Sequence, residues 1–177
     1  MPTDWSALAT RLQVGLGLAA APIAITFTAS SPAGVPAFDK AMPEPMGDGR
    51  TGRVSAGCVF WMESVDRTFA TVAEDHANCS VGSVTHGFKT LADVAHNEDV
   101  AALLECNWVT EAAIPTIPVV IERPGAVIYG PLAETPTDPD VALLRITGRQ
   151  LMVLHDAFPN LRIEGKPQCH IIAIANG

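Results

Sequence analysis

Hydrophobic and polar residues alternate with a helical period near the start of the chain and change to a strand-like pattern soon afterwards. Four apolar residues recur every three or four positions over residues 4–18, which predicts an amphipathic helix: Trp5, Leu8, Leu12 and Leu16. Thr3 or Asp4 is placed to cap its first turn. After Pro22, residues 23–29 are rich in β-branched and aromatic side chains and predict a strand.

The rest of the chain continues to mix helical and strand-like segments. The patterns predict helices over 57–67, within 83–91, over 91–108 and after Thr147, and strands over 69–73, 119–122, 126–129, 141–146 and 168–173. Strands 119–122 and 126–129 are expected to form a hairpin or to follow one another. This order predicts an α/β or α+β fold, with a single mixed sheet and helices packed on it.

One long segment interrupts these patterns. Residues 31–53 contain four prolines and four glycines, a composition that favours neither a helix nor a central strand. We expect a loop of this length to be a lid, a binding loop or a segment that faces a partner. The chain of 177 residues is otherwise most simply one domain over 1–177.

Composition and charge narrow the possible partners. The chain is 48% hydrophobic and only 17% charged, which indicates a compact globular protein. Its net charge of -8 argues against binding to nucleic acid or to an anionic membrane surface. The apolar run 14–21 is too short to span a bilayer and lacks the basic segment of a signal peptide. We therefore expect a cytoplasmic protein with reduced thiols, and the sequence leaves open whether it forms a homo-oligomer.

Polar and titratable side chains are concentrated in residues 74–88, between a predicted strand and a predicted helix. This segment contains carboxylates, hydroxyls, two imidazoles and a thiol, including Asp75, His76, Cys79 and His86. Turns that lead from a strand into a helix commonly bind ligands in α/β proteins and lower cysteine pKa values. We therefore place a metal or redox-cofactor site around Cys79, with His76 or His86 beside it.

The four cysteines suggest which cofactor this site holds. They are far apart in the sequence and form no CxxC pair, but an iron–sulfur cluster can take thiolates from distant segments. We predict Cys58, Cys79 and Cys106 as the metal ligands, with Cys169 as a possible fourth. His76 and His86, with Asp75, would then act in catalysis as acid/base or substrate-positioning groups.

Other interpretations of the same residues remain open. His76 and Cys79, with His86, have donor types that zinc also accepts. Haem could take His76, Cys79 or His86 as its axial ligand, in a pocket lined by apolar residues such as Trp61. A metal-free cysteine hydrolase would use Cys79 with one of the imidazoles, oriented by Asp75 or Asn78. Each cysteine taken singly could also be a small buried hydrophobe.

The sequence resembles a known but uncharacterised family. Gly57-Cys58-Val59-Phe60, then Glu74-Asp75-His76 with Asn78-Cys79 and Gly82, then Thr85-His86-Gly87 and finally Gly148-Arg149-Gln150 resemble the domain of unknown function 169. The likeness covers most of the chain after about residue 20, and this chain departs from it at Ser80, where proline is expected. The resemblance implies a shared site at His76, Cys79 and His86 and names no substrate.

These observations predict a metallo-redox protein. Its most favoured form is an iron–sulfur enzyme that acts reductively or in desulfurising chemistry on a small molecule, with an electron donor as a possible partner. The alternatives are a non-catalytic carrier or sensor for haem or a metal, and the metal-free hydrolase.

Overall fold

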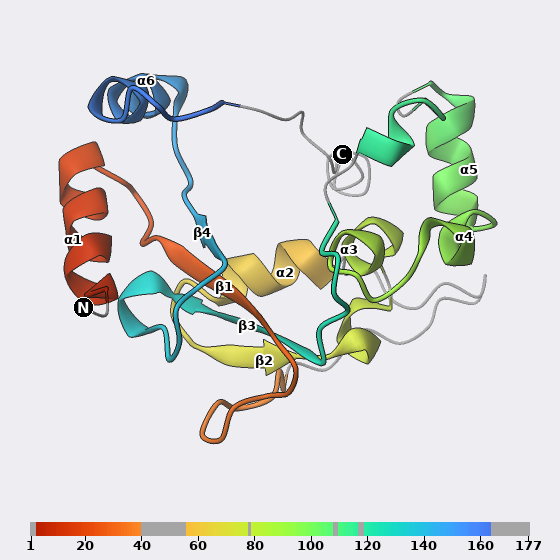
Figure 1. Ribbon diagram of the computed structural model, residues 1–177, viewed down its shortest axis with the longest axis horizontal. Coiled ribbons are helices and arrows are strands. Elements are labelled where there is room, and N and C mark those ends of the chain that lie inside the picture. Colours follow the sequence, from red (N-terminus) through yellow and green to blue (C-terminus); the bar gives the residue numbers. More distant parts are fainter. Residues whose placement is uncertain (1–2, 40–55, 78, 108–109, 117–118, 164–177) are drawn as a thin grey trace.

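The computed structural model describes residues 3–39, 56–77, 79–107, 110–116 and 119–163, without the side chains of 56–59 and 98–99 (Figure 1). Most of the predicted loop 31–53 and all of the predicted strand 168–173 lie outside the described residues. The helices within them are α1 (Trp5–Leu16), α2 (Ala56–Glu63), η1 (Ala73–His76), α3 (Ser80–Thr85), α4 (Leu91–Val94), α5 (Glu98–Glu105), η2 (Ile114–Thr116), η3 (Leu132–Glu134) and α6 (Gly148–Ala157).

A single sheet organises these helices. Its strands are β1 (Ile23–Thr28), β2 (Phe69–Thr71), β3 (Ala126–Pro131) and β4 (Val141–Leu143), in the order β2-β3-β1-β4. All three strand pairs are antiparallel, and one isolated parallel bridge joins Ala37 to Ala70. Every residue of β3 is buried, as expected for a strand paired along both edges. The predicted fold class, one sheet with helices packed on it, is confirmed.

The two faces of the sheet carry different cores. Because neighbouring strand residues point to opposite faces, Ala24 and Ile25 of β1 belong to different clusters. Ala24 packs with Ala9 of α1 and Leu132 of η3. Ile25 packs on the larger cluster, which is aromatic and is formed by Phe60, Phe69, Cys79, Phe88, Val127 and Tyr129. The polar segment predicted to hold the site therefore lies on the aromatic face.

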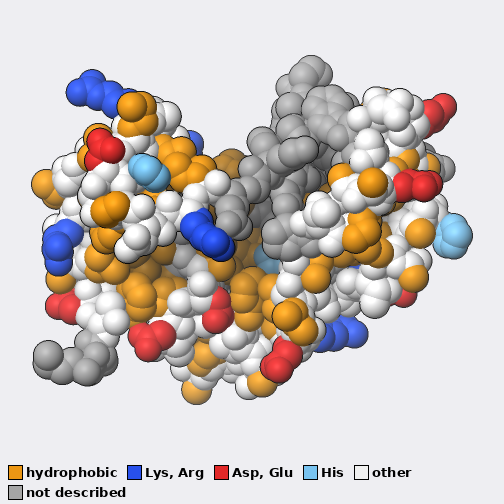
Figure 2. All heavy atoms as spheres, turned by 45° about the horizontal axis from the view of Figure 1, so that its top comes forward, with side chains coloured by type: hydrophobic (Ala, Val, Ile, Leu, Met, Phe, Trp, Pro, Cys, Tyr) orange, Lys and Arg blue, Asp and Glu red, His pale blue; other side chains and the backbone are white. Residues whose placement is uncertain are grey.

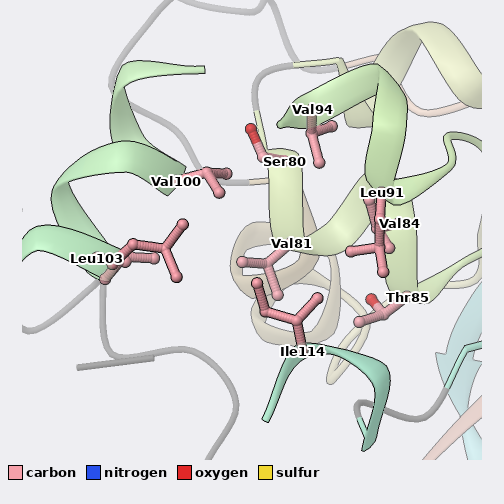
Figure 3. A pocket seen from close by; sticks show the side chains of 10 residues that line it. Ser80, Val81, Val84, Thr85, Leu91, Val94, Val100, Leu103 and Ile114 are labelled. Atoms are coloured by element: carbon pink, nitrogen blue, oxygen red, sulfur yellow. The ribbon is translucent and has the colours of Figure 1, made fainter. Parts of the chain in front are cut away.

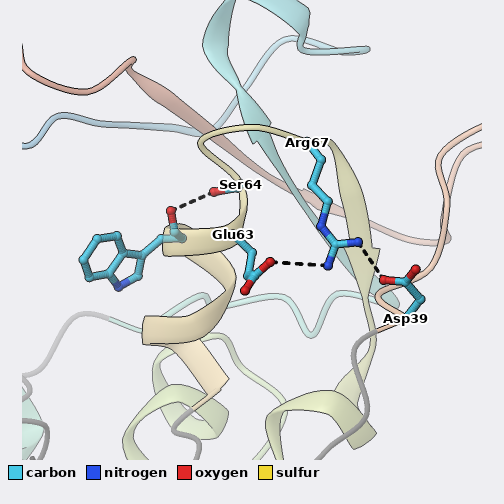
Figure 4. Close-up of polar contacts among 5 residues, drawn as sticks. Asp39, Glu63, Ser64 and Arg67 are labelled. Carbon is cyan, nitrogen blue, oxygen red and sulfur yellow. Dashed lines mark hydrogen bonds and ion pairs between the residues drawn. The ribbon is translucent and has the colours of Figure 1, made fainter.

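Arg67 braces the edge of the sheet at β2 (Figure 4). Its guanidinium lies 2.6 Å from the carboxylate of Asp39 and 3.6 Å from that of Glu63 at the end of α2. The same group stacks over the rings of Phe38 and Phe69, at 5.6 and 5.2 Å from their centroids. Since the ion pairs are partly exposed, each contributes at most about 1 kcal/mol, and the arginine acts mainly by covering the aromatic core.

Helix α6 is attached to α1 through one side chain. The amide nitrogen of Gln150 donates to the carbonyls of Leu16 and Gly17, at 2.9 and 3.0 Å, and so satisfies the carboxyl end of α1. Its amide oxygen accepts from the backbone of Thr147, which completes the cap of α6. Hydrophobic side chains remain on the surface around these two helices (Figure 2), among them Val14, Met152 and Val153.

Two of the predicted elements are wrong. Residues 91–108 do not form one helix: α4 ends at Val94, and after the extended backbone of Asn97 a new helix, α5, begins. Residues 119–122 are not a strand. Val120 donates to the carbonyl of Thr85 as the chain passes α3, and Ile121 is 95% exposed. The strands that pair with β3 are β1 and β2, so the predicted hairpin does not form.

None of the helices in the described ranges has both the length and the apolar character needed to cross a bilayer.

Candidate functional site

His76 is the most deeply buried polar residue of the predicted site. It ends η1, directly after the edge strand β2, and no part of it is exposed. Its Nε2 lies 2.9 Å from the hydroxyl of Thr71, and that hydroxyl donates to the carbonyl of Val127 at 3.2 Å. A hydroxyl has one proton, so Thr71 accepts from Nε2–H, and Nδ1 of His76 carries the lone pair. Among the described residues, Nδ1 has no hydrogen-bond partner.

His86 has its own fixed tautomer. It caps the carboxyl end of α3, and its Nδ1 lies 2.7 Å from the carbonyl of Gly82. A carbonyl only accepts, so Nδ1 carries the proton and Nε2 carries the lone pair. Nε2 lies 2.9 Å from the hydroxyl of Tyr129 on β3, which must therefore donate to it. Each imidazole thus has one nitrogen that donates to the protein and one with a lone pair.

The two imidazoles lie together inside an aromatic shell. Their ring centroids are 4.9 Å apart, and Phe88 lies 4.9 Å from His76 on one side. Phe60 of α2 lies 4.8 Å from His76, and Phe27 of β1 meets His86 edge-on at 5.7 Å. Water is largely excluded from such a shell, so charged forms of the imidazoles are disfavoured and polar contacts become stronger.

Burial therefore favours the neutral form of both histidines. Loss of solvation lowers the pKa of His76 to about 3, and the nearby His86 lowers it further in the same direction. Burial also lowers the pKa of His86, although its hydrogen bond to the Gly82 carbonyl acts the other way. Neutral imidazole is the form that binds metal ions and accepts protons.

Cys79 joins this site through the start of α3. It is buried in the aromatic cluster, and its Sγ accepts a hydrogen bond from the backbone of Gly82 at 3.1 Å. This cap explains why α3 begins at Ser80, three residues before the predicted start. The hydroxyl of Ser83 donates to the carbonyl of His76 at 2.6 Å and ties α3 to η1. The turn that contains His76 and Cys79 is thus held by its own side chains.

The other predicted site residues lie in different surroundings. Asp75 is half-buried, and its carboxylate accepts from the backbone of Val72 at 2.8 Å; burial raises its pKa. Cys106 is exposed at the end of α5, where its thiol donates to the carbonyl of Leu103. Cys58 belongs to α2, but its side chain lies outside the described residues, as does all of Cys169.

The donors that the structure describes do not form a complete metal site. No three His, Cys, Asp or Glu side chains in the described ranges are grouped so that they could hold a metal ion together. The predicted convergence of Cys58, Cys79, Cys106 and Cys169 therefore stays a prediction.

Two residues of the site were not predicted from the sequence. Thr71 fixes the tautomer of His76 and Tyr129 donates to Nε2 of His86, whereas the sequence suggested Asp75 or Asn78 as the partner that orients an imidazole. Thr71 shares its face of β2 with Phe69, and Phe69 lies opposite Tyr129 in the register of β2 and β3. The available signals were that Thr71 is a polar residue in a buried strand and that Tyr129 is the only tyrosine of the chain.

A mostly apolar pocket lies on the other side of α3 (Figure 3). Val81, Val84 and Thr85 of α3 line it, together with residues of α4, α5 and η2. Between them in the sequence, the backbone of Gly82 donates to Sγ of Cys79 and the hydroxyl of Ser83 donates to the carbonyl of His76. The hydroxyl of Ser80 at its rim accepts from the side chain of Asn97 at 2.6 Å. The hydroxyl of Thr85, which lines the pocket, lies 3.3 Å from Nδ1 of His86, so the pocket borders this histidine through one side chain.

The fold and the site define a class of protein: an α/β domain with one antiparallel sheet and two neighbouring histidines on its aromatic face, His76 buried and His86 partly buried. Residues 11–170 match the DUF169 family, described as uncharacterised ArCR, and the chain belongs to this family. Comparison with curated proteins and with solved structures found no match.

Proposed function

We propose that the protein binds a transition metal through Nδ1 of His76, with His86, Cys79 and other cysteines as candidates for the further ligands, and uses it in redox chemistry. The observation that carries this proposal is Nδ1 of His76, a lone pair in a dry aromatic core with no partner among the described residues. An unpaired buried polar atom costs free energy, so it calls for a functional explanation.

The surroundings of His76 support a metal as that explanation. Metal-binding histidines almost always donate their other ring N–H to the protein, which fixes the tautomer. His76 does this through Thr71, and His86 does it through Gly82. The thiol of Cys79, three residues after His76 and buried on the same aromatic face, adds a soft donor, and a set of imidazole and thiol donors suits iron, zinc or copper.

A more specific form of the proposal names further ligands and the cofactor. Since the described donors do not complete a site, we propose Cys58 as a ligand, with Cys106 and Cys169 as the remaining candidates. With these cysteines the centre would be an iron–sulfur cluster that acts reductively or in desulfurising chemistry on a small molecule. Its colour separates it from the alternatives, because haem gives a sharp Soret band and a metal-free hydrolase is colourless.

Replacement of His76 tests the proposal directly. In His76→Gln the side-chain amide can still donate to Thr71, but no nitrogen remains at the δ position. We expect protein purified without oxygen to contain stoichiometric metal and His76→Gln to lose most of it, as measured by elemental analysis. His155→Gln is the matched control, because His155 is exposed on α6 and should leave the metal content unchanged. Metal-free wild-type protein, or full loading of His76→Gln, would overturn the proposal.

The two described cysteines give a second test. Cys79→Ser should lower the metal content strongly, since it replaces a buried soft donor, three residues after His76, with a hydroxyl. The exposed Cys106 provides the comparison. If Cys106→Ser retains its metal and absorption spectrum, the centre lies at the histidine cluster without Cys106; if it loses them together with Cys79→Ser, both cysteines are ligands. A Cys79→Ser variant that keeps its metal would exclude this thiol as a ligand.

A further inference from the structure

We infer that Tyr129 is an internal competitor of the metal at His86, so that metal uptake requires its hydroxyl to release Nε2. This inference rests on the proposed metal site and concerns its regulation. His86 has only one nitrogen that can coordinate a metal, because Nδ1–H is held by the carbonyl of Gly82 at 2.7 Å. The hydroxyl of Tyr129 occupies the lone pair of the other nitrogen at 2.9 Å.

The two histidines therefore differ in whether their lone pair is available to a metal. Nδ1 of His76 is without a partner among the described residues, whereas Nε2 of His86 is engaged. The ring centroids lie 4.9 Å apart in the same shell, so release of the tyrosine would free a second imidazole lone pair within it. A metal that reaches His76 would thus gain its second imidazole ligand only by displacing an existing hydrogen bond.

The sheet holds Tyr129 firmly in this blocking position. Tyr129 is almost completely buried on the central strand β3, with Ile25 and Phe69 as its partners on the two sides. Its ring packs against those of Phe60 and Phe69, with centroids 5.6 and 5.8 Å away. The hydroxyl can therefore be removed by Tyr129→Phe while the ring and its packing are kept.

The hydroxyls of Thr71 and Tyr129 should then have opposite effects on metal affinity. Thr71 accepts the proton of His76 and so supports a ligand, whereas Tyr129 donates to the nitrogen that the metal needs. Loss of a supporting partner of this kind typically weakens metal binding roughly tenfold or more. Loss of the competing hydrogen bond should strengthen it by up to roughly tenfold, because the metal-free state loses one internal bond.

Titration of the metal-depleted protein with Co²⁺, followed by its ligand-field absorption, tests the inference. We expect Tyr129→Phe to bind Co²⁺ more tightly than the wild type and Thr71→Val to bind it more weakly. General damage to the fold would weaken binding in both variants, so the opposite signs are diagnostic. Equal or weaker binding by Tyr129→Phe, with wild-type binding that depends on His76, would overturn the inference and leave the proposed function standing. A wild-type protein that binds no Co²⁺ would instead count against the metal site itself.

Discussion

Transfer of the metal-free protein from pH 8 to pH 5 should lower its free energy of unfolding by about 2 kcal/mol, because each pKa unit corresponds to about 1.4 kcal/mol. Burial holds the pKa of His76 near 3, below its ordinary value of 6.5. Between these values the unfolded chain binds a proton that the folded chain excludes. The stabilisation is therefore complete above pH 6.5 and is lost as the pH falls toward 3.

Other groups modify this dependence without removing it. The pKa of His86 is also lowered by burial and acts in the same direction, whereas that of Asp75 is raised and acts against it. Asp39 and Asp93 have lowered pKa values, so their effect comes only in stronger acid. Urea unfolding at pH 8, 7, 6 and 5 measures the slope, and His76→Gln is the control. Parallel curves for the wild type and this variant would show that His76 is not the cause.

Gly125→Ala should destabilise the fold by about 3 kcal/mol, the upper part of the range for overpacking a tight site. A Cβ at this position would overlap the backbone carbonyl of Ala29. The overlap cannot be relieved by a side-chain rotation, and the N–H of Gly125 is already bound to the carbonyl of Thr28 at 2.8 Å. Thermal and urea unfolding should show the loss.

A second glycine gives the matched control. Gly15 lies near the end of α1 with open space around the position of a Cβ. Gly15→Ala should therefore stabilise the protein slightly, by about 0.5–1 kcal/mol, since alanine restricts the unfolded chain and favours helix. Unchanged stability of Gly125→Ala would mean that the junction between β1 and β3 can widen without cost.

The sequence predicted those parts of the fold that depend on local patterns. The first helix follows from apolar spacing and the strand after Pro22 from its β-branched and aromatic composition, and α1 and β1 confirm them. The sequence does not predict the break between α4 and α5 because the apolar period continues across it, whereas the extended backbone of Asn97, whose side chain donates to Ser80, separates the two helices. Residues 119–122 have the composition of a strand but cross α3 instead, a choice made by tertiary contacts.

The candidate site also has one part that the sequence could predict and one part that it could not. His76, Cys79 and His86 could be grouped from the sequence because they lie within one turn of chain and the helix that follows it. Thr71 and Tyr129 could not, because their contact with the imidazoles depends on the register of β2 and β3 and on which face each residue occupies. Burial, which sets the pKa values of both histidines, is likewise a property of the assembled core.

The two sides of the histidine site differ in how easily their backbone can move. Tyr129 belongs to a strand that is hydrogen-bonded along both edges, whereas His76 and His86 come from η1 and α3, helical segments of only four and six residues. Segments with few internal hydrogen bonds open at lower free energy than a central strand. A ligand that enters would therefore meet a rigid strand at Tyr129. The turn that carries the histidines is the part that would have to move.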